Sequence, residues 1–294
     1  MNEKEIKKLK HAGEIAKQVK EYARQIIKPN ILLLEIAEKI EAKIIELGGK
    51  PAFPVNLSKN EIAAHSTPSF NDTETASGLL KVDIGVHIDG FVADTAFSLD
   101  LENSEENKKL IEAAELALKK AVETINLNVS LRKIGSVIEK AITSENFEPI
   151  RNLSGHSIKE YELHAGLTIP NHDNLQEIKI EEGVYAIEPF ATTGLGQVIN
   201  GKLSNIYQIQ KEGQVRDSFA REVLAFIKEE YKTLPFCARQ LHKKFSSRVV
   251  IALKQIEDAG ILHNHPQLIE SSRKPVAQAE HTIIITKKEK IITT

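Results

Sequence analysis

The protein has 294 residues, of which 41% are hydrophobic, and a formal net charge of −2. This balance argues against a surface made for nucleic acid or membrane lipid, and the single cysteine, Cys237, excludes an internal disulfide and a Cys-based zinc site. No signal-peptide core follows the charged start, and no apolar run approaches the roughly 20 residues that span a bilayer. We therefore expect a soluble, cytoplasmic protein.

The first part of the chain is predicted to be helical. Apolar residues recur at helical spacing over 3–28, and a second helix over about 33–47 is expected to end at Gly48-Gly49. The following segment, 50–68, contains several prolines and polar residues. That composition predicts an extended segment with loops.

The next segment, KVDIGVHIDGFVADTAF (81–97), predicts a β-hairpin with Asp89-Gly90 in the turn. In that register the opposed pairs are Ile88 with Phe91, Gly85 with Asp94, and Asp83 with Ala96. Asp83 and Asp94 would then share one face as diagonal neighbours, beside open space at Gly85. Because an unpaired buried carboxylate is costly, the two acids and the space indicate a place for a cation. A one-residue slip would put the acids on opposite faces.

Helices and strands are expected to alternate over the rest of the chain. Ser104 predicts an N-cap for a helix to about Ile125, and another helix begins after Ser130. Strands with irregular ends are expected in NFEPIRNLSGHSI, GVYAIEPFATTG and VAQAEHTIIIT. Three consecutive helices followed by a loop at His265-Pro266 make 208–272 a helical insertion, and 1–207 with 273–294 would form the main domain.

Three further polar residues lie at the mouths of predicted strands: His156, Glu188 and Glu280. Each alone is most simply a polar residue at a strand end. Together with Asp83 and Asp94 they make one imidazole and four carboxylates, a set that suits a pair of divalent first-row ions. Two ions about 3.5–4 Å apart can lower the pKa of a shared water for attack on a carbonyl.

The order of these five residues is similar to the ligand pattern of the methionine aminopeptidases and of the wider pita-bread family, which includes prolidase and aminopeptidase P. The segments NEIAAHSTP, KVDIGVHIDGFVADTA, NLSGHSI, LHAGLTIPN, AIEPFATTG and AQAEHT resemble the type 2 enzymes across essentially the whole chain. The inserted helices resemble the feature that marks type 2, and no long N-terminal extension precedes them, as in its short form. The resemblance implies an α+β pita-bread fold with a winged-helix-like insertion.

The resemblance also implies an activity and a role for each ligand. The enzyme would remove the N-terminal methionine of nascent polypeptides, using two divalent ions of Co, Mn, Fe or Zn. Asp83 would chelate one ion, Asp94 and Glu280 would bridge both, and His156 and Glu188 would hold the other. A hydroxide bridging the ions would attack the scissile carbonyl, and Glu188 would also transfer a proton.

Further residues follow from the same resemblance. His65 would contact the scissile-bond region or the substrate amino end, and His164 would position the carbonyl and the developing oxyanion. Phe53 would line the pocket for the methionine side chain. His87, on the strand face of Asp83, is a candidate for a group behind the ligands.

Two positions depart from the family pattern. Ala279 and His265 stand where an aromatic residue is usual. Both changes are expected to alter the shape of the pocket or the preferred residue after methionine.

Three alternative interpretations stay open. A prolidase or aminopeptidase P would use the same ligands but usually carries a sizeable domain ahead of them, whereas about 80 residues precede Asp83 here. A non-enzymatic relative would typically lose ligands, and all five are present. A basic stretch could contact RNA or, transiently, the ribosome; it consists of Arg239, His242, Lys243, Lys244 and Arg248. A basic helix face is more often solvated and the net charge gives no support for such contacts, so we expect no specific nucleic-acid or membrane partner. Because no coiled-coil seam or exposed apolar helix stands out, we also expect a monomer.

Overall fold

The structure is a computed structural model that describes all 294 residues. Its α-helices are α1 (Glu3–Ile26), α2 (Leu33–Glu46), α3 (Glu105–Thr124), α4 (Leu131–Ser144), α5 (Ser218–Glu230), α6 (Ala238–Phe245) and α7 (Val249–Asp258). None of them is both long and apolar enough to cross a membrane.

The strands form four sheets. The first eight are β1 (Lys50–Pro51), β2 (Asn56–Lys59), β3 (Ile62–Ala64), β4 (Leu79–Ile88), β5 (Phe91–Asp100), β6 (Glu148–Pro149), β7 (Ser154–Ile158) and β8 (Thr168–Pro170). The others are β9 (Gly183–Ile187), β10 (Phe190–Thr192), β11 (Val198–Ile209), β12 (Phe236–Cys237), β13 (Leu262–Glu270), β14 (Val276–Gln278), β15 (His281–Ile285) and β16 (Lys290–Ile292). One sheet has the order β1-β4-β2 with β5 beside β4, and the others are β14-β10-β6, β12-β11-β13-β3 and β16-β15-β9-β7-β8.

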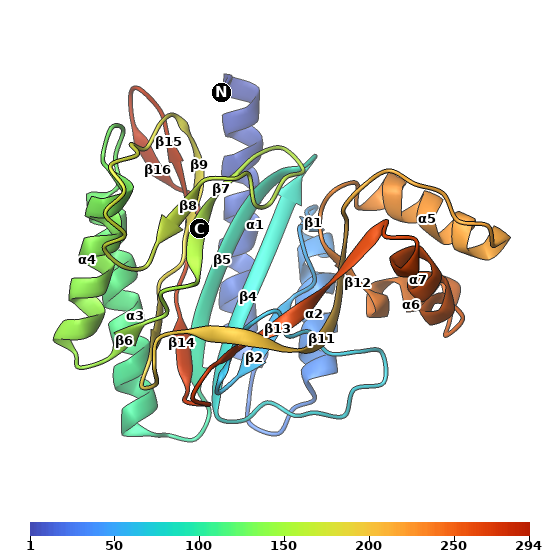
Figure 1. The fold of residues 1–294 in the computed structure, drawn as a ribbon, viewed down its shortest axis with the longest axis horizontal. Coiled ribbons are helices and arrows are strands. Elements are labelled where there is room, and N and C mark those ends of the chain that lie inside the picture. The colour runs from blue at the N-terminus through green and yellow to red at the C-terminus, as the bar shows by residue number, and fades with distance from the viewer.

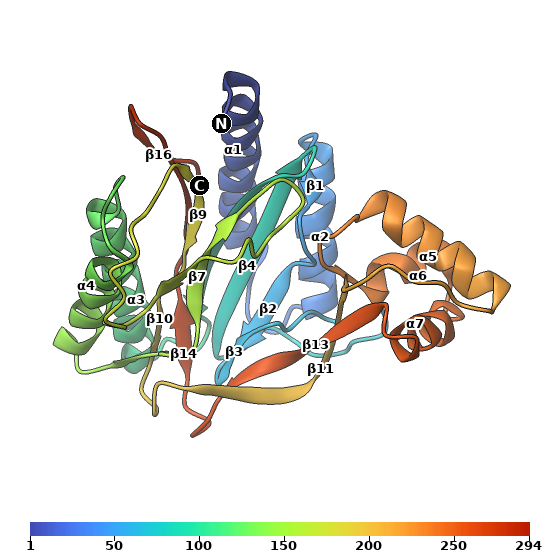
Figure 2. The ribbon, with the colours of Figure 1, turned by 45° about the horizontal axis from the view of Figure 1, so that its top comes forward.

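Each pair of helices covers its own part of the sheets. Helices α1 and α2 share an apolar core with β4 and β5, whereas α3 and α4 share a second core with β9, β10 and β15. Figure 1 shows α3 and α4 on one side of the molecule and α5, α6 and α7 gathered at the other end, beyond β11 and β13. The turned view in Figure 2 shows the same arrangement. Strands β4, β5, β9, β10 and β15 therefore lie between the first two helix pairs.

The helices agree with the sequence predictions. Ser104 and Ser130 both cap helices, because their side chains accept hydrogen bonds from Asn107 N and Lys133 N. The three helices expected after Asp217 are α5, α6 and α7. They enclose a small apolar core of their own.

The expected loop at His265-Pro266 is wrong, because both residues lie within β13. A proline cannot donate to a strand ladder and is tolerated at irregular positions. Pro266 stands opposite Leu203, where the β11–β13 register shifts on both sides. Residues 262–270 are thus strand within the segment 208–272 that was predicted to be helical. The division into two domains at these boundaries stays a prediction.

The hairpin register is confirmed. Asp83 pairs with Ala96, Gly85 with Asp94, and Ile88 with Phe91. Asp89 and Gly90 both have positive φ, 49° and 86°, which is the backbone of the tight two-residue turn. The two acids therefore face the same side of β4 and β5.

Candidate active site

A cavity of about 340 Å³ is lined by residues from all four sheets. Every site residue predicted from the sequence lies in its wall. They are Phe53, His65, Asp83, Asp94, His156, His164, Glu188 and Glu280. Chain segments that are far apart in the sequence thus meet at one place.

The five predicted ligands approach each other closely. The ligand atoms of Asp94, His156 and Glu280 all lie within 4.8 Å of one another. His156 Nε2 is 3.7 Å from Asp94 Oδ2 and 3.6 Å from Glu188 Oε1. Asp83 is the diagonal neighbour of Asp94 on the hairpin face. Asp94, His156 and Glu280 are buried, and the other two ligands are partly buried.

Backbone contacts between β5 and the segment entering β15 hold two of the ligands together. The Asp94 N–H donates to Thr282 Oγ1 at 2.7 Å, and the same hydroxyl donates to Asp94 O at 2.8 Å. Glu280 N donates to Ala96 O, and Thr95 Oγ1 donates to Glu280 O, both at 3.0 Å. These bonds fix the main chain on which both carboxylates stand.

The pKa values of the acids in the site are raised because four buried carboxyl groups lie close together. Burial raises the pKa of Asp83 to about 7. Burial, together with the neighbouring charges of Asp83 and Glu188, holds the pKa of Asp94 well above its usual range. The pKa values of Glu188 and Glu280 are raised for the same reasons. Four acids at one place cannot all ionise without a compensating positive charge.

The unpaired atoms of the site fit bound metal. Asp83 Oδ1, Asp94 Oδ1 and Glu280 Oε2 are buried and have no hydrogen-bond partner. Burial also lowers the pKa of His156 to about 3, which keeps its imidazole neutral and able to bind a metal. Buried polar atoms without partners are rare in native proteins, and this donor set of carboxylates and one imidazole suits divalent first-row ions.

One polar residue of the site was missed in the sequence. Gln278 in β14 is buried, and its Nε2 donates to Glu188 Oε2 at 3.4 Å. Its presence near Asp83 also partly offsets the upward shift that burial causes in the pKa of that carboxyl. Residues two apart in an extended chain share a face. Gln278 stands two positions before Glu280, so this spacing was the signal that could have found it.

The residues predicted to contact the substrate lie around the same cavity. His65 has a left-handed backbone, with φ of 58°, and its Nδ1 lies 3.3 Å from Pro266 O. Burial lowers the pKa of His65 to about 4. The His164 ring stands edge-on to the His156 ring with 4.4 Å between centroids. His265, one of the departures from the family pattern, also lines the cavity.

Several predictions about neighbouring positions are wrong. The space at Gly85 is not open, because the Phe53 ring occupies it. His87 Nδ1 instead accepts the Gly90 N–H at 3.0 Å, so this side chain holds the hairpin turn and does not line the cavity. Ala279 packs into the core beneath α3 and lines a different cavity.

The basic stretch is not a continuous charged surface. The Arg239 side chain is only 1% exposed and is paired with Glu41. His242 stacks on Phe70 with the ring centroids 4.0 Å apart. This arrangement leaves Lys243, Lys244 and Arg248 as the exposed members of the stretch.

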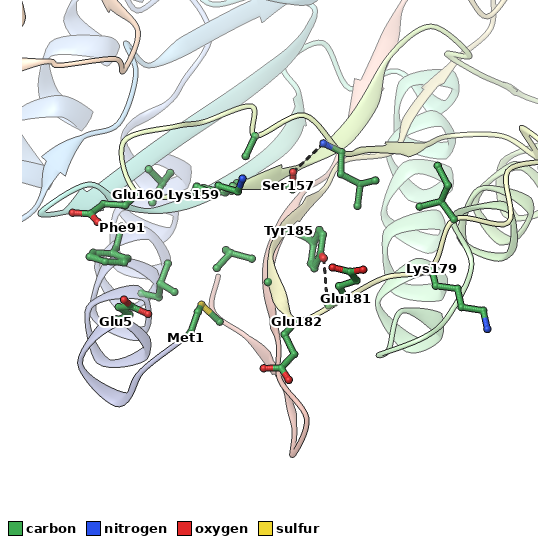
Figure 3. Close-up of a pocket in the computed structure, with 18 residues that line it drawn as sticks. Met1, Glu5, Phe91, Ser157, Lys159, Glu160, Lys179, Glu181, Glu182 and Tyr185 are labelled. Atoms are coloured by element: carbon green, nitrogen blue, oxygen red, sulfur yellow. Dashed lines mark hydrogen bonds between the residues drawn. The ribbon is translucent and has the colours of Figure 1, made fainter.

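A second, larger cavity of about 580 Å³ lies apart from the predicted metal ligands (Figure 3). Its wall includes Met1, Phe91 and Tyr185, together with Lys159 and Lys179. None of the five predicted ligands lines it. It therefore adds nothing to the acid cluster described above.

Comparisons of the sequence with known proteins point to one family. The family model described as metallopeptidase family M24 matches residues 7–287. A methionine aminopeptidase of Pyrococcus abyssi is 49% identical over 99% of both chains.

Solved structures share the fold. A thermophilic Arx1 superposes with a TM-score of 0.84 at 16% identity, covering 100% of this chain and 91% of the other. A methionine aminopeptidase of Thermotoga maritima has a TM-score of 0.73 at 21% identity, with coverage of 100% and 98%. These likenesses confirm the pita-bread fold, and the sequence relatives confirm the predicted resemblance to short-form methionine aminopeptidases. The chain therefore belongs to metallopeptidase family M24 and, within it, to the methionine aminopeptidases, metal-dependent hydrolases that remove an N-terminal methionine.

Proposed function

We propose that Asp83, Asp94, His156, Glu188 and Glu280 hold two divalent ions with which this chain hydrolyses the bond after an N-terminal methionine. The observation that carries the proposal is the set of three buried carboxylate oxygens without hydrogen-bond partners inside one cavity. Co²⁺, Mn²⁺, Fe²⁺ and Zn²⁺ all suit this donor set. Asp83 would bind one ion, Asp94 and Glu280 both, and His156 and Glu188 the other.

Ions held there would polarise the scissile carbonyl and lower the pKa of the attacking water. Glu188 is the residue best suited to move protons. Glu188 is partly exposed to the cavity, and its pKa is raised by burial and nearby acids. The side chain of Gln278 donates a hydrogen bond to the Oε2 atom of Glu188. Glu188 would accept the proton of the water and pass it to the leaving amine.

His65 and His164 would act on the substrate as neutral imidazoles. The Pro266 carbonyl only accepts, so the contact at His65 Nδ1 assigns the proton to that nitrogen. His65 Nε2 is then an acceptor for the amino end of the substrate. His164, next to His156 at the rim, would donate to the oxygen of the scissile carbonyl as negative charge develops on it.

The apolar part of the cavity would take the methionine side chain. Phe53 is buried at the base of this wall. Its apolar neighbours in the lining are Leu163, Leu167, Phe190, Ile206 and Leu268. Methionine is flexible and polarizable, so an irregular apolar wall of this kind can accommodate it.

The test is an assay of metal-stripped protein on a Met-Ala-Ser peptide and on a matched Xaa-Pro peptide, with Mn²⁺, Fe²⁺, Co²⁺ or Zn²⁺ added back singly. We expect metal-dependent release of methionine and none before proline. Cleavage only before proline would assign the chain to the prolidase branch. The proposal is also wrong if Asp94→Ala retains full hydrolysis under saturating metal.

A further inference from the structure

The inserted helix α6 is joined to the rest of the chain by a buried ion pair. The Nη1 and Nη2 atoms of Arg239 donate to the two carboxylate oxygens of Glu41 in α2, each at 2.7 Å. The two side chains are 1% and 7% exposed. A guanidinium and a carboxylate fit each other in this two-bond arrangement. Burying them is costly unless their remaining atoms are also paired.

Those remaining atoms contact the segment that carries His65. Arg239 Nε donates to Pro68 O at 3.1 Å, and its Nη2 lies 3.3 Å from Thr67 Oγ1. The Thr67 hydroxyl donates to Val55 O at 2.8 Å. The Val55 N–H in turn donates to Glu41 at 3.3 Å. The ion pair thus satisfies polar groups of two separate loops.

Both loops form part of the wall of the substrate cavity. Val55 stands between Phe53 and Asn56, which line the cavity, and Thr67 follows the lining residue His65 by two positions. Arg239 itself does not line the cavity. The guanidinium therefore holds the side chains of the wall only through the backbone of their loops.

We propose that Arg239, together with Glu41, is a positioning residue that couples the inserted helix to the loops presenting Phe53 and His65 to the substrate. This inference rests on the proposed function of the cavity. It predicts that loss of the pair loosens substrate recognition while the predicted metal ligands, which stand on other segments of the chain, are unaffected. A pair that served only the packing of α6 would change stability alone.

The main test is the double variant Glu41→Met/Arg239→Met, because replacing both charges by apolar side chains leaves no unpaired buried charge. We expect the KM for Met-Ala-Ser to rise by about tenfold or more as the wall loses its geometry. The bound metal per chain should stay at the wild-type value. The preference for Met-Ala-Ser over Leu-Ala-Ser should fall, an effect that partial unfolding would not produce.

The same two helices supply a matched control. Lys243 in α6 pairs with Glu38 in α2 at 3.1 Å, but both side chains are exposed and neither lines the cavity. Glu38→Met/Lys243→Met should therefore leave KM and the Met/Leu preference unchanged. Thr67→Val should reproduce part of the double variant's effect, because it breaks one of the links, and Thr67→Ser should restore wild-type behaviour.

A second measurement needs no substrate. Hydrogen–deuterium exchange of peptides covering 52–57 and 65–70 should be about tenfold faster in the double variant and unchanged in the control. Unchanged exchange together with unchanged KM and preference would overturn the positioning role. If the wild-type protein released no methionine at all, the proposed function would fail, and the exchange result would still decide whether Arg239 holds the two loops.

Discussion

The ring of Phe53 lies where a side chain on Gly85 would be. A Cβ atom built on Gly85 would be 2.3 Å from Phe53 Cε1. Gly85 pairs with Asp94 across the hairpin. The absence of a side chain at this position therefore lets an apolar residue of the cavity wall approach the strand pair that carries the acids.

Gly85→Ala should push the Phe53 ring out of place, since 2.3 Å is far below a normal contact. We expect a loss of about 1–3 kcal/mol of stability from overpacking and weaker binding of methionyl peptides. Thermal unfolding and KM measure the two effects. The double variant Phe53→Leu/Gly85→Ala should recover stability but not KM. Equal recovery of both would contradict a role for the ring in the pocket.

Metal binding should release protons at slightly acidic pH. Burial raises the pKa of Asp83 to about 7, so below that pH the metal-free site carries protons that the ions must displace. Calorimetry of Mn²⁺ binding in buffers of different ionisation enthalpy should show more released protons at pH 6 than at pH 8. The Asp83→Asn variant, which has no proton to lose there, should show fewer. Equal release at both pH values would contradict the raised pKa.

Gln278→Leu should lower metal affinity or kcat/KM by about 10–100-fold, because residues that orient ligands commonly have effects of this size. The variant removes the hydrogen bond that Gln278 donates to Glu188. Gln208→Leu is the matched control, since Gln208 donates to Thr233 O and does not line the cavity. Metal titration followed by peptide hydrolysis compares the two. Equal activity of both variants would show that Gln278 does not orient Glu188.

Cys237 should be unreactive in the folded protein. It is buried, and burial raises the pKa of its thiol to about 11. Because the folded pKa exceeds the unfolded one, the thiol favours folding below about pH 9, and this contribution declines as the pH rises toward 11. A thiol reagent at pH 8 should react with Cys237 only after unfolding. The stability difference between wild type and Cys237→Ala should shrink between pH 9 and pH 11.

The parts of the fold that local sequence determines were predicted correctly. Helix caps such as Ser104 and the turn at Asp89-Gly90 depend on a few neighbouring residues, and the structure has them. The hairpin register followed from that turn. The hairpin pattern pointed to Asp83 and Asp94, and polar residues at strand ends supplied the other candidate ligands. Their roles, and the remaining site residues, came from the resemblance to a family, and the structure gathers them all around one cavity.

The errors concern contacts between distant residues. Phe53 lies in the connection between β1 and β2, and its ring fills the space at Gly85. No local sequence pattern around Gly85 reveals this contact. Arg239 looked like part of a solvated basic face, yet its partner Glu41 lies 198 positions away. Pro266 suggested a loop because proline disfavours strands. The irregular pairing with β11 that accommodates it is a property of the folded sheet.

The hydrogen bond between Thr95 and Glu280 joins positions 185 residues apart. At a synthesis rate of about 5–20 residues per second, Glu280 is translated roughly 10–40 s after the hairpin that carries Asp83 and Asp94. The proposed metal site, which includes Glu280, therefore cannot assemble until nearly the whole chain has been translated. A truncated product that ends before Glu280 would contain Asp83 and Asp94 but would lack the complete set of predicted ligands, so we expect it to be inactive.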